Sequence, residues 1–438
     1  DGKGANYYSS YAIEGNYKLS KLKTKIMEKA GLKHLNFDDP TVDKFYFPSL
    51  HFGTTRFTSD SVVTFYRGSS LAFYDVIDSS LVSESLDMAN RWLLRSLTDT
   101  GKFNYRYFPS SGKYSSKNNM IRQLMASRVL AELASADESL LEAHRRNLRF
   151  IFKNWYKENG HQGFISFNNK SKLGATAMAL RVLVYSPLFN EYKERAQKLV
   201  NTLLFLQKND GSWEPWYQPP AYPYDEDYLL TFYSGEAILS LVEYYKLTCD
   251  EEVLRAASLS QNFYIHRYVT NMESNYYPAY VPWHTMSIYH LYLMKQEKRY
   301  AEAVFKMNDK LLKIQNLALG PWPDIYGRFF NPAHPEFGTP HVSSDAVYFE
   351  GLTYALEVAH LERDSARIKR YQKAVLAALQ NLLHLQCKDA DLYYLHYPYR
   401  VKGAFRTNVI DNRIRIDNTQ HSIDALNRVI GLFSRGQL

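Results

Sequence analysis

Carboxylate side chains stand near the starts of several apolar helical stretches of this sequence. Glu236 follows an aromatic, acidic segment, and Glu350 occupies the corresponding place in a later stretch. A carboxylate in the first turn of a helix lies near the positive end of the helix dipole. Two carboxyl groups that face one cavity could protonate the leaving oxygen of a glycosidic bond and activate a water molecule. We predict that Glu236 and Glu350 form such a pair; the alternative is that each only caps a helix. The further candidates are Asp225, Asp227, Asp324 and Asp345.

Two histidines open other stretches of the same kind. His284 follows Trp283, and His421 follows Gln420. Because the unperturbed pKa of histidine lies near neutrality, either ring could act as a general base or bind a uronate; the alternative is a hydrogen-bonded histidine in a cavity. If the histidines are central and the carboxylates are not, proton abstraction by a lyase or an epimerase is favoured, and the candidate partners are Tyr224, Tyr348, Arg122 and Asn418.

Aromatic and cationic residues near the same positions are candidates for binding a substrate. Flat aromatic faces with polar edges suit sugar rings, and a guanidinium can bind a carboxylate or sulfate through two hydrogen bonds. Packing within loops and internal ion pairs are the alternatives. The aromatic candidates are Trp213, Trp216, Tyr217, Tyr222, Tyr224, Trp283 and Trp322, and the cationic ones are Arg122 and Arg328.

Two kinds of predicted helix alternate along the chain from residue 80 onward. The first kind has charges interspersed among apolar residues at helical spacing, and we expect it at 80–97, 137–154, 190–208, 250–267, 297–316 and 364–386. The second kind is less charged, carries small residues near its start, and begins near Met120, Leu173, Ser234, His284, Tyr348 and Gln420. Such an alternation indicates a repeat architecture of outer and inner helices.

The loops that lead into the inner helices are long and aromatic, whereas the returns, such as 135–137 and 249–251, are short. Short returns make antiparallel neighbours, so all six long loops should emerge at one end. Long loops in a compact domain are usually functional. Three of them open with similar turns, namely Thr100-Gly101-Lys102-Phe103, Asp210-Gly211-Ser212-Trp213 and Gly320-Pro321-Trp322.

Six outer and six inner helices with Gly-x-aromatic turns resemble the six-hairpin (α/α)6 barrel of many glycoside hydrolases, polysaccharide lyases and sugar epimerases. The resemblance covers residues 80–438, and residues 236–257 also look like the helical domain of the glucuronyl C5-epimerases. The run Gln207-Lys208-Asn209-Asp210-Gly211-Ser212-Trp213 resembles the Gln/Trp turn of squalene and oxidosqualene cyclases. Their Asp-x-Asp-Asp motif is not matched, because Asp225-Glu226-Asp227 is followed by Tyr228.

The N-terminal part differs in texture from the rest. Residues 17–27 predict an amphipathic helix, and β-branched or aromatic runs at 44–47 and 61–66 predict strands. Residues 67–70 separate the second run from 71–74, as in a hairpin. We therefore expect an N-terminal extension with a small β-hairpin region at 1–78 and an (α/α)6 barrel catalytic domain at 79–438.

Bulk composition limits the partners. The net charge of +8 and pI near 9.0 mildly favour an acidic partner, and an anionic glycan fits. The sequence has no dense Lys/Arg run, so we expect no binding of nucleic acid. No apolar run reaches the roughly 18 residues that span a membrane.

Cys249 and Cys387 allow at most one disulfide and no cysteine-rich zinc site. We expect no cofactor and no metal centre. The sequence leaves two questions open, namely a calcium site built from scattered carboxylates and the oligomeric state.

An all-α (α/α)6 barrel with a small strand-containing N-terminal region is the predicted fold. The resemblance implies a carbohydrate-active enzyme acting on a polysaccharide or oligosaccharide, with hydrolysis by a carboxylate pair as the first choice. A uronic-acid epimerase or lyase is second; a non-catalytic glycan-binding or assembly protein and a terpenoid-cyclase-like toroid are further alternatives. The start at Asp1 rather than Met indicates processing and favours a periplasmic or secreted protein over a cytoplasmic one.

Overall fold

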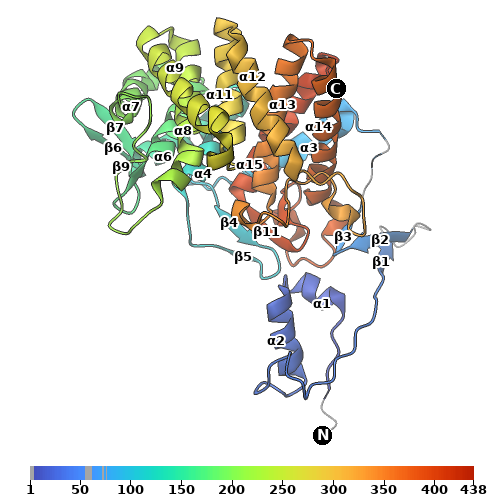
Figure 1. Ribbon diagram of the computed structural model, residues 1–438. Helices are drawn as coiled ribbons and strands as arrows, with labels where there is room; N and C mark the ends of the chain where they lie inside the picture. The colour runs from blue at the N-terminus through green and yellow to red at the C-terminus, as the bar shows by residue number, and fades with distance from the viewer. Residues whose placement is uncertain (1–3, 55–61, 72–73, 75) are drawn as a thin grey trace.

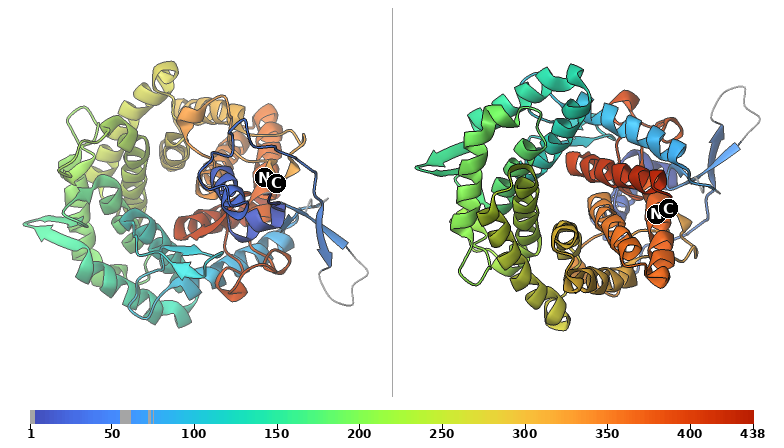
Figure 2. Two further views of the ribbon diagram at one scale, coloured as in Figure 1. Left: turned by 90° about the horizontal axis from the view of Figure 1, so that it is seen from below. Right: turned by 90° about the horizontal axis from the view of Figure 1, so that it is seen from above.

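Two concentric rings of helices make up the body of the protein (Figure 1, Figure 2). The computed structural model describes residues 4–54, 62–71, 74 and 76–438. The outer helices are α3 (Ser79–Ser96), α5 (Leu141–Asn154), α7 (Lys193–Leu206), α9 (Glu251–Ile265), α12 (Lys298–Leu311) and α14 (Ser365–Leu385). The inner helices are α4 (Met120–Ala136), α6 (Leu173–Val184), α8 (Glu226–Thr248), α11 (Tyr280–Lys295), α13 (Val342–Leu361) and α15 (Ile416–Ser434).

The inner ring is closed. Contacts run from α4 to α6, α8, α11, α13 and α15 in turn, and α15 contacts α4 again. Small residues permit this close convergence: a Cβ atom on Gly235 of α8 would lie 2.5 Å from Cβ of Trp283 on α11, and one on Gly351 of α13 would lie 2.6 Å from Cα of Pro282. The predicted (α/α)6 fold class is thus confirmed.

Glycine turns lock four of the outer helices to the next one. Gly101, Gly211, Gly327 and Gly403 have φ angles of 89°, 90°, 86° and 90°, which non-glycine residues rarely adopt. An added Cβ would lie between 1.8 and 2.7 Å from a carbonyl oxygen of the following outer helix in all four cases. Gly403 meets Met88 of α3 in this way, so the last turn of the chain packs on the first outer helix and closes the outer ring.

Glutamines at three of these turns repeat one set of contacts. The Nε2 atoms of Gln207, Gln315 and Gln386 donate to backbone carbonyls of α9, α14 and α3, respectively. The prediction that Gly320-Pro321-Trp322 forms the third such turn was wrong. Phe329 pairs with Gln315 as Trp213 pairs with Gln207, so the equivalent turn is Gly327-Arg328-Phe329, while the Trp322 side chain is exposed.

The long loops all emerge at one end of the rings, as predicted (Figure 1). Two sheets join loops that are distant in sequence: one has the order β10-β11-β4-β5, and the other pairs β8 with β9. We call this end the loop end. Its strands are β4 (Arg106–Phe108), β5 (Lys113–Tyr114), β6 (Tyr156–Asn159), β7 (Gln162–Ile165), β8 (Ser171–Lys172), β9 (Trp216–Gln218), β10 (Arg406–Asn408) and β11 (Asp411–Arg415).

Four inner helices begin earlier than their sequences predict. The carboxylate of Asp225 accepts the backbone N–H of Tyr228 and caps α8, which begins at Glu226 rather than near Ser234. Acidic residues stabilise a helix start, so a segment expected to be a loop is instead the first turns of α8. Helices α11, α13 and α15 likewise start a few residues before the predicted points. Glu236 therefore lies well inside α8, away from the helix dipole's positive end.

The N-terminal part comprises α1 (Ser9–Glu14), α2 (Leu19–Lys29) and an antiparallel sheet of β1 (His51–Thr54), β2 (Val62–Tyr66) and β3 (Ser69–Ser70). Helices α1 and α2 lie beyond the loop end (Figure 1). Residues 44–47 form no strand, contrary to prediction, and β1 begins later. Arg67 and Gly68, with φ of 46° and 80°, make a two-residue turn, so β3 precedes the strand predicted at 71–74. Residues 61 and 72–73 of the predicted strands lie outside the described residues.

Two further expectations concern the membrane and the cysteines. None of the described helices is long and apolar enough to cross a membrane. Cys249 is exposed at the end of α8, and Cys387 is buried after α14. Both thiols are free, so the disulfide that the sequence left open does not form in this structure.

Candidate active site at the loop end of the inner ring

Glu236 is a buried carboxylic acid on the α8 face that meets α6. Its side chain is 3% exposed, and Oε2 has no hydrogen-bond partner among the described residues. Gly174 makes room for it, since a Cβ atom there would lie 2.3 Å from Oε2. Burial raises the pKa of Glu236 to about 8, and the charges of Arg181 and Lys172 offset this only in part. The carboxyl group is therefore protonated at neutral pH and can donate a proton.

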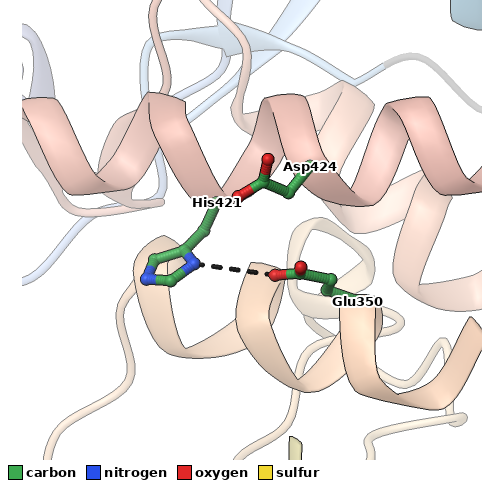
Figure 3. A group of neighbouring side chains, drawn as sticks. All are labelled: Glu350, His421 and Asp424. Carbon is green, nitrogen blue, oxygen red and sulfur yellow. Dashed lines mark ion pairs between the residues drawn. The ribbon is translucent and has the colours of Figure 1, made fainter. Parts of the chain in front are cut away.

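Glu350, His421 and Asp424 form a buried group between α13 and α15 (Figure 3). The Nδ1 atom of His421 lies 3.8 Å from Oε2 of Glu350. Burial and the nearby charge of Asp424 raise the pKa of Glu350, whereas His421 and Arg128 oppose the rise. Asp424 is held by the guanidinium of Arg128 and the amide of Gln420.

The same three side chains could share a cation. One potential ligand atom from each lies within 4.8 Å of the others. The guanidinium of Arg128 already compensates the Asp424 carboxylate, which weakens the attraction for a metal ion. The arrangement fits a proton-exchanging acid and base better than a dedicated metal centre.

Glu236 and Glu350 lie on opposite sides of the inner ring. Glu236 is at the α6–α8 contact and Glu350 at the α13–α15 contact, which face each other in the closed order of inner helices. Trp283 of α11 stands between them: its Cβ lies beside Gly235, and its ring centroid is 5.9 Å from that of His421. The two carboxyl groups are therefore related across the axis rather than in contact.

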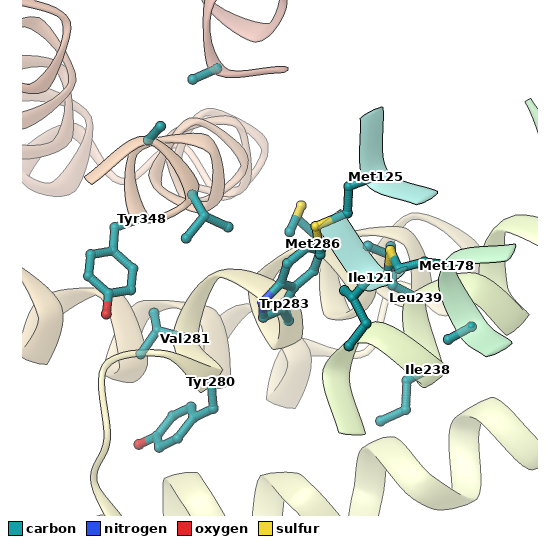
Figure 4. Close-up of a cluster of buried hydrophobic side chains, with 14 of the residues drawn as sticks. Ile121, Met125, Met178, Ile238, Leu239, Tyr280, Val281, Trp283, Met286 and Tyr348 are labelled. Atoms are coloured by element: carbon teal, nitrogen blue, oxygen red, sulfur yellow. The ribbon is translucent and has the colours of Figure 1, made fainter. Parts of the chain in front are cut away.

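Apolar side chains fill the middle of the ring. Figure 4 shows part of this apolar cluster, and its labelled residues include Met125 of α4, Met178 of α6, Leu239 of α8 and Met286 of α11. All four are buried. The barrel is consequently a packed core and not a channel, so a substrate has to be bound from the loop end.

A guanidinium–carboxylate cluster lies at the loop end of α4 and α15. Asp417 accepts from Arg122 at 3.0 Å and from Arg415 at 2.7 Å, and Arg122 also donates to the hydroxyl of Tyr105. Although Asp417 is buried, Arg122 and Arg415 hold its pKa down at about 2. The predicted substrate ligand Arg122 is thus engaged in an internal ion pair. Sequence reasoning missed Asp417, whose only signal was an acidic residue in the first turn of a helix.

Lys172 is a second residue that sequence reasoning missed. It ends β8, and its Nζ lies 5.4 Å from the ring centroid of Trp216 and 5.8 Å from that of Tyr233. Burial lowers the pKa of this lysine. It lines a cavity of about 230 Å³ at the starts of α4 and α6.

The other predicted acids and His284 lie elsewhere. Asp225 caps α8, and Asp227 pairs with Arg267 at 2.7 Å; both are on the surface. His284 is buried between Ser234 and Gln261, and burial lowers its pKa to about 3.

Asp324 and Asp345 are buried away from the two glutamates. Asp324 is paired with Arg67 at 2.8 Å, and burial raises its pKa. Asp345 accepts the backbone N–H of Phe329, and burial raises its pKa to about 6.

The predicted aromatic ligands divide between core and surface. Trp213 is fully buried and Tyr348 nearly so, which leaves neither ring a face for a sugar in this structure. Tyr224 is exposed and packs edge-on against Trp216, with ring centroids 5.5 Å apart. Trp322 is exposed beneath the guanidinium of Arg67, and the predicted ligand Arg328 is buried over Phe330.

Solved structures of sugar-modifying enzymes share this fold, although no known protein family and no curated protein sequence matches the chain. The GH76A α-1,6-mannanase of Salegentibacter sp. HEL1_6 is 15% identical with a TM-score of 0.58, over 81% of this chain and 100% of that one. A D-mannose isomerase is 10% identical with a TM-score of 0.63, over 82% and 100%. A sugar epimerase from a ruminal bacterium is 12% identical with a TM-score of 0.60, over 80% and 98%. Identities this low establish the common fold.

Proposed function

We propose that this protein is a carbohydrate-active enzyme that hydrolyses a glycosidic bond of a polysaccharide or oligosaccharide bound at the loop end. The observation that carries the proposal is the buried carboxyl group of Glu236, whose Oε2 has no hydrogen-bond partner among the described residues and which lies across the inner ring from Glu350. Proteins of the same fold include a mannanase, and an unsaturated glucuronyl hydrolase specific for heparin.

The environments of the two glutamates assign their roles. Oε2 of Glu236 has no hydrogen-bond partner in the described part of the chain, and Glu236 donates the proton to the leaving oxygen. Glu350 stands beside His421, and the hydrogen bond between them counteracts the rise in the pKa of Glu350. Glu350 activates the water molecule. Inverting hydrolysis uses two carboxyl groups on opposite faces of the sugar, and Glu236 and Glu350 lie on opposite sides of the ring axis, with Trp283 between them.

Release of new reducing ends tests this proposal. The protein is incubated with neutral and acidic polysaccharides, and reducing sugar is measured alongside ultraviolet absorbance. Wild type should release reducing ends without forming an unsaturated product, and Glu236→Gln and Glu350→Gln should each lower turnover by about 100-fold or more. Full turnover in both variants would show that the acid and base lie elsewhere.

Sugar epimerisation is a second candidate, favoured by the contact between His421 and Glu350. An imidazole 3.8 Å from a carboxylate can act as the base that removes a proton from carbon on one face of the sugar, and a second acid on the opposite face then donates a proton to the same carbon. Deuterium uptake from heavy water into a glycan that keeps its length would identify this reaction. Loss of the uptake in His421→Asn, but not in Glu236→Gln, would assign it to the α13–α15 side of the ring.

A further inference from the structure

The cavity beside Lys172, at the starts of α4 and α6, has an excess of positive charge. Lys170 and Lys172 both line it, and it measures about 230 Å³. Lys170 donates to the hydroxyl of Tyr222 at 2.9 Å. The nearby Arg122 is already neutralised by Asp417. Among the described residues, no carboxylate lies within ion-pair distance of Lys172, whose ammonium group lies beside the rings of Trp216 and Tyr233.

Two buried donors, one beside Lys172 in the chain and one across the β8–β9 pairing, have no partner among the described residues. Ser171 is fully buried with no partner for Oγ, and Trp216 is 7% exposed with no partner for Nε1. The β8–β9 pairing brings them together, since Lys172 pairs with Trp216 across the two strands. Buried donors normally find a hydrogen-bond partner. An ammonium group without a carboxylate partner, at a cavity that a second lysine also lines, fits an anionic group.

Lys172 connects the cavity to the helix that carries the proposed general acid. Lys172 lies over the ring of Tyr233, one turn before Glu236 on α8, and the charge of Glu236 acts on Lys172. The buried rings of Trp216 and Tyr233 flank the ammonium group and favour its charged form through cation–π contacts. A group bound here would hold its sugar next to the reacting bond.

We propose that the cavity lined by Lys170 and Lys172 is a subsite for an acidic substituent of the glycan, either the carboxylate of a uronic acid or a sulfate. The inference rests on the proposed function, because it assigns a substrate class to the same loop end. Lys172 is the residue that recognises the anion, through its ammonium group. Lys170, held by Tyr222, adds long-range attraction.

Binding measurements separate this subsite from catalysis. Neutral, uronate-bearing and sulfated oligosaccharides are presented on an array, and the strongest of each class is titrated by calorimetry. Wild type should prefer one of the charged classes, and which one it prefers identifies the substituent. Lys172→Gln should weaken that binding about tenfold or more and leave binding of the neutral oligosaccharides unchanged, whereas Lys172→Arg should retain most of it.

Lys402→Gln is the matched control. Lys402 is also at the loop end but pairs with Asp389 at 2.7 Å, so its removal changes the net charge equally without touching the cavity. The subsite would be overturned if wild type bound neutral and charged glycans with equal affinity, or if Lys402→Gln lost as much affinity for charged glycans as Lys172→Gln. Either result would leave the proposed function standing. If no oligosaccharide of any class binds, the proposed function itself is overturned.

Discussion

Replacing Glu236 by Gln should stabilise the protein at alkaline pH while it abolishes activity. The folded state binds the Glu236 proton more tightly than the unfolded state, because burial raises its pKa from 4.5 to about 8. Stability therefore falls as pH rises from about 4.5 to about 8. By proton linkage this difference corresponds to at most about 5 kcal/mol of unfolding free energy at pH 8 and above. Gln has the same shape and no charge to bury.

Glu243→Gln on the same helix is the matched control with the opposite sign. Glu243 is also buried but is paired with Arg181 at 2.6 Å, and this pairing lowers its pKa. Its contribution to stability is present above the unfolded pKa and is lost as pH falls through the folded value. Removing one partner of a buried ion pair costs about 3–5 kcal/mol, so Glu243→Gln should be less stable than wild type at neutral pH.

Urea unfolding followed by circular dichroism at pH 5 to 9 provides the measurement. The stability of Glu236→Gln relative to wild type should grow between pH 5 and pH 8. Glu132 and Asp345, whose pKa values are raised to about 7 and about 6, also titrate in this range. They are common to both proteins and cancel in the difference. A difference between Glu236→Gln and wild type that stays constant from pH 5 to pH 9 would refute the assignment of Glu236 as a protonated buried acid.

Three other predictions follow from the same geometry. Activity at a fixed substrate concentration should fall on the alkaline side with an apparent pKa near 8, as Glu236 ionises, and a profile flat to pH 10 would contradict its role as acid. Asp417→Asn should lower the unfolding free energy by about 2 kcal/mol at neutral pH and by nothing near pH 2. The lowered pKa of Asp417 stabilises the folded state above the pKa of the unfolded state, and this stabilisation is lost as pH falls to about 2. Equal urea midpoints of Asp417→Asn and wild type at pH 7 would contradict this prediction. Gly327→Ala should cost about 3 kcal/mol or more, since its Cβ would lie 1.8 Å from the carbonyl oxygen of Ala377 at a φ of 86°, and an unchanged melting temperature would exclude this packing.

The repeat architecture could be predicted because it depends on local patterns. Charged amphipathic helices and helices with small residues alternate, and their spacing was enough to place the outer helices and to gather the long loops at one end. The Gly-x-aromatic turns at Gly101 and Gly211 were also identifiable, since a left-handed φ selects glycine. The third turn was misplaced because Gly320 and Gly327 both precede an aromatic residue by two positions.

Helix starts were less predictable than helix identities. Aromatic and acidic residues at the start of α8 are typical both of loops and of capped first turns, and the cap of Asp225 on Tyr228 decides between them. The placement of Glu236 well inside α8 follows from that contact. Its protonation results from burial against Gly174, not from a helix dipole.

The charge states of the buried carboxylates were decided by the tertiary structure alone. Glu236 and Asp417 are both acids on inner helices and both buried, yet one has a pKa of about 8 and the other of about 2. The difference is whether a guanidinium from a distant segment reaches the carboxylate, as Arg122 of α4 does for Asp417. Sequence determined which chemical groups line the inner ring, because their types and helical spacing are local properties. Only the closure of the ring decided which groups are neutralised, since electrostatic interaction depends on distance in space and on burial.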